Sequence, residues 1–183
     1  MLIKPQQIKM RNGFTIEIRS ASVLDVEEIA NHRKITSAET YYMARYPEEC
    51  VFDMETMRSM LRNIENSPND FMVTAFMNGK IVGDLGVTML RPHIKYRHRA
   101  YMGISIQKEF CNCGLGSIMT EIAIEQARKN GFEQLELGVF ADNDRAIHLY
   151  EKYGFKKYGI QPNAFKLKDG TYRDEIIMVN MLQ

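Results

Sequence analysis

The chain has 183 residues, of which 24 are Lys or Arg and 23 are Asp or Glu, so its formal net charge is +1. At roughly 150 residues per domain, this length predicts a single domain that can bury its own core. Hydrophobic residues make up 45% of the chain, a share that excludes a disordered or low-complexity protein, and the balanced charge gives no support for nucleic-acid binding.

The first part of the chain predicts a tail, a strand and two helices. Residues 1–13 are polar and irregular, and we interpret them as an N-terminal tail that precedes a single domain at 14–183. Residues 14–19 alternate apolar and polar side chains, the pattern of a half-buried strand. Ser22 is placed to begin a helix, and Asp53 to cap a second helix that carries apolar side chains at helical spacing.

The second part of the chain predicts a hairpin and then alternating strands and helices. Residues 71–77 and 80–90 flank Asn78-Gly79, a strong signal for a tight hairpin turn. The remaining elements are a strand at 97–106, a helix from Leu115 to Gly131, a strand around 135–139, a helix from Asp142 or Asn143 to Gly154, and strands at about 156–167 and 172–181. The order is β-α-α-β-β-β-α-β-α-β-β, an α/β fold, or α+β by looser accounting.

A glycine-bearing loop joins the strand at 97–106 to the helix that follows it. Gly114 and Gly116 let the backbone approach a ligand closely, and the free N–H groups of a helix N-terminus favour an anion. Such a loop more often serves only to reverse the chain. A P-loop would need Lys after the last glycine, where Ser117 stands, and a dinucleotide-binding fingerprint would need a third glycine in place of Met119.

Two blocks of sequence resemble the GNAT superfamily of acyl-CoA-dependent N-acetyltransferases. Residues 104–116 (ISIQKEFCNCGLG) are similar to the family's Gln/Arg-x-x-Gly-x-Gly/Ala element, with Cys111 in place of Gln or Arg. Residues 143–155 (NDRAIHLYEKYGF) match the Asn-x-x-Ala-Ile-x-Leu-Tyr-x-x-x-Gly-Phe signature. The resemblance covers about 71–181. It implies a mixed, mostly antiparallel twisted sheet of about seven strands flanked by about four helices.

The resemblance also implies acetyl-CoA as co-substrate and assigns residues to it. In this family the strand before the loop diverges from its neighbour, and the pantetheine arm lies in the gap. Backbone groups of Ile104, Ser105 and Ile106 are then expected to contact the pantetheine and the thioester carbonyl. The pyrophosphate is expected to lie on Asn112, Cys113, Gly114, Leu115, Gly116 and Ser117. Asn143 is expected to contact the cofactor, to cap its helix, or both.

The resemblance makes Tyr150 the general acid that protonates the departing CoA thiolate. A phenol with a pKa of about 10 is still protonated at pH 7 and can supply a thiolate whose conjugate acid has a pKa of about 8.5. The alternative is an aromatic core residue. The general base stays open: relatives that act on protein N-termini have Glu where this chain has Gly138. The candidates are Glu136, His98 and a chain of water molecules.

The predicted reaction is direct transfer of an acetyl group to the primary amine of a small metabolite, such as an amino acid or a polyamine, in a ternary complex. Substrate recognition is expected from residues 37–42, where Glu39 is a candidate to bind an ammonium group. Gly138 argues against a protein N-terminus as the substrate. A non-catalytic acyl-CoA-binding sensor, a protein N-terminal acetyltransferase and an enzyme using a longer acyl-CoA are the alternatives.

The remaining sequence features predict no metal and no membrane contact. Cys50, Cys111 and Cys113 lack the spacing of a redox pair or a zinc site, and reduced thiols are expected. No run approaches the roughly 18 apolar residues of a membrane span, and the N-terminus has no signal-peptide pattern. We therefore expect a cytoplasmic protein that binds no nucleic acid, with a homodimer as the default oligomer.

Overall fold

The computed structural model of the chain describes residues 2–182; Met1 and Gln183 lie outside the described part. The elements in chain order are β1 (Gln6–Lys9), β2 (Thr15–Arg19), α1 (Val26–Glu39), α2 (Met54–Asn66), β3 (Phe71–Met77), β4 (Lys80–Met89), β5 (Arg99–Ile106), α3 (Leu115–Lys129), β6 (Gln134–Phe140), α4 (Asp144–Lys152), β7 (Lys156–Lys166) and β8 (Tyr172–Met181). This order confirms the predicted fold class.

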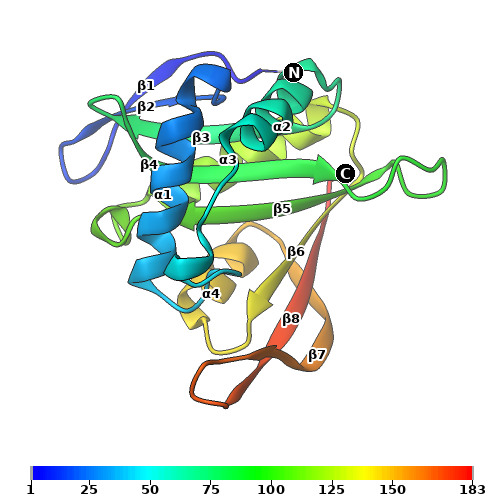
Figure 1. Cartoon of the computed structure of the whole chain (residues 1–183). Helices are drawn as coiled ribbons and strands as arrows, with labels where there is room; N and C mark the ends of the chain where they lie inside the picture. Colours follow the sequence, from blue (N-terminus) through cyan, green and yellow to red (C-terminus); the bar gives the residue numbers. More distant parts are fainter. Residues whose placement is uncertain (1, 183) are drawn as a thin grey trace.

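The strands form one mixed sheet in the order β1-β2-β3-β4-β5-β6-β8-β7. Neighbouring strands are antiparallel except for β5 and β6, which are parallel. Helices α1 and α2 pack on one face of the sheet, and α3 and α4 contribute to the core on the other face (Figure 1). The sheet therefore separates two cores, as expected for a layered α/β domain.

Local signals in the sequence explain where several elements begin and turn. Asn78 (φ 51°) and Gly79 (φ 77°) both have positive φ, as a two-residue hairpin turn between β3 and β4 requires. The Asp53 side chain accepts hydrogen bonds from the N–H groups of Glu55 and Thr56 and so caps α2. Ser22 and Asp25 form a capping box, although the chain first makes a short 3-10 turn before α1 begins.

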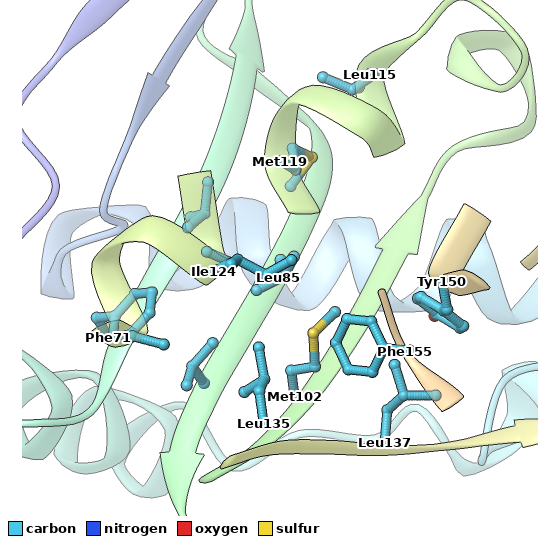
Figure 2. Close-up of a cluster of buried hydrophobic side chains, with 14 of the residues drawn as sticks. Phe71, Leu85, Met102, Leu115, Met119, Ile124, Leu135, Leu137, Tyr150 and Phe155 are labelled. Atoms are coloured by element: carbon cyan, nitrogen blue, oxygen red, sulfur yellow. The ribbon is translucent and has the colours of Figure 1, made fainter. Parts of the chain in front are cut away.

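The larger core lies between the sheet and helices α3 and α4, and Figure 2 shows part of it. Leu115 and Met119 of α3 are almost fully buried there. Gly83 of β4 makes this close packing possible: a Cβ at that position would lie 2.9 Å from the Met119 Sδ atom. The glycine thus lets α3 lie close to the sheet, which brings the N-terminus of this helix to the end of β5.

One prediction was wrong at the N-terminus. Gln6–Lys9, expected to belong to an irregular tail, form strand β1, which pairs antiparallel with β2 and brings the sheet to eight strands rather than about seven. The strand was missed because it lies at the sheet edge with mostly exposed side chains, so it has no alternation of apolar and polar residues. Ile3 and Met10, which flank it, are buried.

The pairing of β5 with β6 covers only three residue pairs, from Arg99 opposite Gln134 to Tyr101 opposite Glu136. Beyond this point the two strands diverge, and Figure 1 shows β6 and β8 turning away from β5. Backbone groups that would pair in a continuous sheet are left without a neighbouring strand on that side. We refer to the gap between residues 102–106 and 137–140 as the seam.

Candidate active site

A cavity of about 570 Å³ follows the seam and ends at the N-terminus of α3. We call it the larger cavity. Its wall comes from strands β5 and β6, the loop before α3, helix α4 and the segment after α1, together with Phe165 of β7, Glu175 of β8 and Arg11 of the β1–β2 turn. The residues expected to bind a cofactor that line it are Ile104, Ser105, Ile106, Asn112, Gly114, Gly116, Ser117, Asn143 and Tyr150.

The loop before α3 has the geometry of an anion site. Asn112 (φ 60°) and Gly114 (φ 93°) adopt left-handed backbone conformations, and Gly114 is the N-cap of the helix. The Ile118 N–H makes the first intrahelical bond, to the Gly114 carbonyl, so the preceding N–H groups of the first turn have no helical acceptor. These N–H groups and the helix dipole suit a diphosphate.

Cys113 and Leu115 take part in this loop through their backbone. The Cys113 thiol donates to the Phe110 carbonyl oxygen at 2.9 Å, and the Leu115 side chain is 1% exposed in the larger core. Neither residue lines the larger cavity. The Cys111 thiol does line it, but burial raises its pKa, so the sulfur stays protonated and is a poor nucleophile.

Three cations near the loop were not predicted as site residues. Arg145 of α4 and Arg11 of the β1–β2 turn line the larger cavity, and the Lys152 ammonium lies 3.4 Å from the Ser117 hydroxyl oxygen. Arg145 lies inside the 143–155 sequence block, and its place in this block is the signal that could have identified it. Arg11 falls in the segment interpreted as a tail. Their positive charges complement a ligand that carries several phosphates.

Strand β5 is held at the seam by a buried histidine of α1. The His32 Nε2 atom lies 2.9 Å from the Ser105 hydroxyl oxygen, and the His32 side chain is fully buried. Burial lowers the pKa of His32 to about 4, so the imidazole is neutral at pH 7. Its contact with Ser105 is therefore a hydrogen bond between two neutral groups. This contact fixes the Ser105 side chain toward α1.

Tyr150 and Asn143 of α4 lie at the cavity as predicted in sequence. The Asn143 side chain accepts a hydrogen bond from the Ala146 N–H at 3.3 Å, so it caps the helix. The Tyr150 ring packs against the Phe155 ring, with 5.7 Å between the ring centroids (Figure 2), and Tyr150 is 7% exposed. Burial raises the pKa of Tyr150 above its ordinary value, and its hydroxyl has no hydrogen-bond partner in the described residues. A neutral phenol is thus free to donate.

The two side chains predicted as candidate bases lie elsewhere. The Glu136 carboxylate is held by the Arg99 guanidinium and by the Tyr158 hydroxyl, is 4% exposed, and does not line the larger cavity. His98 lies in the turn before β5, roughly 20 Å along the chain from Ser105 at the rise of an extended strand. Neither Glu136 nor His98 is among the residues that line the larger cavity.

The segment after α1 covers the seam. The Tyr41 hydroxyl donates to the Asp142 carboxylate at 2.8 Å, and the Tyr42 hydroxyl donates to the Asp142 carbonyl oxygen at 3.1 Å. Tyr42 also lines the larger cavity. Glu39, predicted to bind an ammonium group, instead accepts a hydrogen bond from the Lys108 backbone N–H at 2.7 Å and does not line that cavity.

A second cavity of about 400 Å³ adjoins the first under the α1–α2 connection, and we call it the smaller cavity. The two share Tyr101, Gly103 and Ser105 of β5, among others. Its wall is largely apolar, with three charged residues, Arg33, Arg45 and Asp84. The Asp84 carboxyl accepts a hydrogen bond from Thr74, and burial raises its pKa to about 6. Arg33 forms no ion pair with the carboxylates of residues 2–182.

In residues 2–182 no three His, Cys, Asp or Glu side chains lie together so as to hold a metal ion, and the absence of a metal stays a prediction. The same part of the chain contains no helix with the length and apolar character of a membrane span.

A diverging parallel strand pair, a helix N-terminus suited to an anion and the Tyr150 side chain thus lie along one cavity. The sequence matches the acetyltransferase (GNAT) family over residues 30–155. The chain belongs to this family and is an N-acetyltransferase, as the two sequence blocks predicted.

Two curated relatives are named as N-acetyltransferases. The chain is 30% identical over 120 residues to the L-amino acid N-acetyltransferase AaaT of Escherichia coli K12, a match that covers 64% of this chain and 72% of that protein. It is 37% identical over 75 residues to the ribosomal protein bS18-alanine N-acetyltransferase of the same strain. That second match spans 41% of this chain and 50% of the relative.

Solved structures agree with the fold. A GNAT-family acetyltransferase from Streptococcus pneumoniae superposes with a TM-score of 0.86 at 32% identity and covers 91% of this chain and 99% of that one. The yncA protein of Salmonella typhimurium, solved with its cofactor acetyl-CoA, gives a TM-score of 0.79 at 18% identity, covering 92% of this chain and 94% of its own. The second likeness concerns the fold alone.

Proposed function

We propose that the protein transfers the acetyl group of acetyl-CoA to the primary amine of a small, carboxylate-bearing metabolite of the amino-acid type, by direct attack in a ternary complex. One observation carries the proposal: the larger cavity runs from the anion site to Tyr150 and adjoins the smaller cavity along β5. A cofactor and an acceptor can therefore meet at the seam.

The residues of the larger cavity fit acetyl-CoA. The free N–H groups at the start of α3 and the Arg145 side chain suit its diphosphate, and the seam offers unpaired backbone groups to the pantetheine arm. When bound, acetyl-CoA supplies the acetyl thioester. Backbone N–H groups of residues 104–106 then donate to the thioester carbonyl oxygen, and Tyr150 donates its proton to the departing sulfur.

The smaller cavity favours an acceptor with a carboxylate over a polyamine. Arg33 is half-buried in its wall and forms no ion pair with a carboxylate of the described residues, although it interacts electrostatically with Asp84 in the same wall, so its guanidinium can bind a carboxylate of a ligand. The similarity to an L-amino acid N-acetyltransferase points to the same substrate class. The match to the bS18-alanine enzyme covers only half of that relative.

The test is release of the CoA thiol from acetyl-CoA with a panel of amino acids, polyamines, aminoglycosides and short peptides, alongside calorimetry of acetyl-CoA binding. Turnover on amino acids and not on polyamines supports the proposal. Turnover on peptides alone would assign the protein to N-terminal acetylation. Binding of acetyl-CoA without turnover on any acceptor would make it a sensor, and a preference for longer acyl-CoA would change the donor.

Replacing Arg33 by Met is expected to raise KM for an amino-acid acceptor about tenfold or more, because a hydrogen bond to a charged group contributes about 1.5–3 kcal/mol. KM for the corresponding amino-acid amide, which lacks the carboxylate, should change little. Steady-state kinetics with both acceptors give the comparison. Arg62→Met removes an exposed arginine of α2 and serves as the matched control. Equal effects on both acceptors would rule out a carboxylate contact.

A further inference from the structure

Gly138 of β6 lies just beyond the last paired residues of β5 and β6. Its backbone N–H donates to the Tyr101 hydroxyl oxygen at 2.9 Å, in place of a bond to a neighbouring strand. A Cβ at position 138 would lie 3.0 Å from this hydroxyl oxygen and only 2.7 Å from the carboxyl carbon of Glu175. The volume that a side chain at 138 would fill is thus occupied by the Glu175 carboxylate.

The β6–β8 register explains how Glu175 reaches this point. Glu175 lies directly opposite Phe140, and Gly138 lies opposite Ile177, so Glu175 and Gly138 are diagonal neighbours on the same face of the sheet. A long side chain spans this diagonal easily when the partner has no side chain of its own. The carboxylate therefore lies at the seam, beside Tyr101.

The fold does not use this carboxylate. In the described part of the chain the Glu175 side chain makes no hydrogen bond and no ion pair, although it is half-buried, and burial alone raises its pKa. Of the described residues that line the larger cavity, Glu175 is the only carboxylate. The titratable groups of the other elements around that cavity are Arg11, Tyr42, Tyr101, Cys111, Arg145 and Tyr150.

We propose that Glu175 is the general base of the reaction: from the last strand, its carboxylate occupies the place that a side chain at position 138 would fill and accepts a proton from the acceptor amine at the seam. This inference rests on the proposed function and adds the base to it. The absence of a side chain at Gly138 is then a requirement of the site.

Glu175 and Tyr150 together account for the proton transfers of the reaction. An alkylammonium acceptor must lose one proton before its nitrogen lone pair can attack, and Glu175 accepts that proton and passes it to solvent. The C–N bond then forms while the C–S bond breaks, and the Tyr150 proton goes to sulfur. The second nitrogen proton returns to Tyr150 through water. One proton is released to solvent per acetyl group transferred.

The first test compares Glu175→Gln with the wild type over pH 6 to 10 on an alkylamine acceptor that the wild type uses. We expect kcat/KM of the variant to fall about 10²-fold at pH 7 and to rise about tenfold per pH unit up to the pKa of the amine, about 10. The wild-type kcat/KM should instead level off once Glu175 is ionised. With hydroxylamine, which is already uncharged at neutral pH, the variant should lose little activity.

A second variant moves the carboxylate to the neighbouring strand. Gly138→Glu alone is expected to be poorly active because its side chain collides with Glu175 and Tyr101. Combined with Glu175→Ala, the same substitution should restore kcat/KM to within about tenfold of the wild type, since a positioned general base contributes about 10²-fold or more. Glu121→Gln removes an exposed carboxylate of α3 and is the matched control for charge. The melting temperature should be unchanged in Glu175→Gln, since the carboxylate has no partner to lose.

Different results would contradict the proposed function and the assignment of Glu175 as the base. A wild-type protein that releases no CoA with any amine contradicts the proposed function, and the role of Glu175 falls with it. Wild-type turnover that Glu175→Gln retains at pH 7 on the alkylamine overturns the base assignment and leaves the proposed function standing. An equal loss with the alkylamine and with hydroxylamine also overturns it, because such a loss reflects structure rather than proton transfer.

Discussion

Replacement of Tyr150 by Phe is expected to lower kcat by about 10²- to 10³-fold, because the CoA thiolate then leaves without a proton donor. The ring keeps its packing against Phe155, and the lost hydroxyl has no partner in the described residues, so the fold should be unaffected. The dissociation constant for acetyl-CoA should therefore stay within a few-fold of the wild-type value. Steady-state CoA release and calorimetry on the same preparation measure both quantities.

The dependence of the wild-type kcat on pH is a second test of the role of Tyr150. Burial raises its pKa, so the acid stays protonated, and its own ionisation should cause no loss of kcat below about pH 10, the ordinary value. Tyr153→Phe removes the hydroxyl of a neighbouring tyrosine that does not line the larger cavity and is the matched control. If Tyr150→Phe turned over as fast as this control, Tyr150 would be a core aromatic residue only.

Replacement of Arg99 by Met is expected to destabilise the protein by about 3 kcal/mol, because it leaves the Glu136 carboxylate buried with Tyr158 as its remaining partner. For a chain of this size the melting temperature should fall by about 6–12 °C. Thermal and denaturant unfolding measure the loss. Lys129→Met, which breaks an exposed pair with Glu125 on α3, should have little effect.

A double variant separates the ion pair from other roles of Arg99. Arg99→Met with Glu136→Leu removes both charges, and we expect it to recover most of the lost stability, since the cost arises from an unpaired buried charge. It should also keep its turnover, because Glu136 does not line the larger cavity. A double variant as stable as the wild type but without turnover would restore Glu136 as a candidate base.

Local sequence signals predicted most of the fold because they act over a few residues. The Asn78-Gly79 turn and the Asp53 cap formed as the side-chain chemistry requires. Strand β1 could not be predicted this way, because its pairing depends on β2 and not on a pattern of its own.

In the candidate site too, the residues set by local sequence could be predicted, and those brought together by tertiary packing could not. The anion loop and the Asn143 and Tyr150 positions lie in two short blocks, so the sequence alone predicted where they stand. Glu175 and Gly138 are 37 positions apart, and only the register of β6 against β8 brings them together. Arg33 and Asp84 meet the smaller cavity from different layers of the fold. Such neighbours are set by tertiary packing, which no local pattern encodes.

The seam also creates strand edges that must be protected inside the sheet. A sheet that divides in its middle has strand edges inside the molecule as well as at its rim, and an unpaired edge is a template for another strand. Here the inner edges are covered: Tyr41 and Tyr42 fasten the segment after α1 to Asp142, across the opening. We expect this cover to oppose pairing of the inner edges with a strand of a second chain.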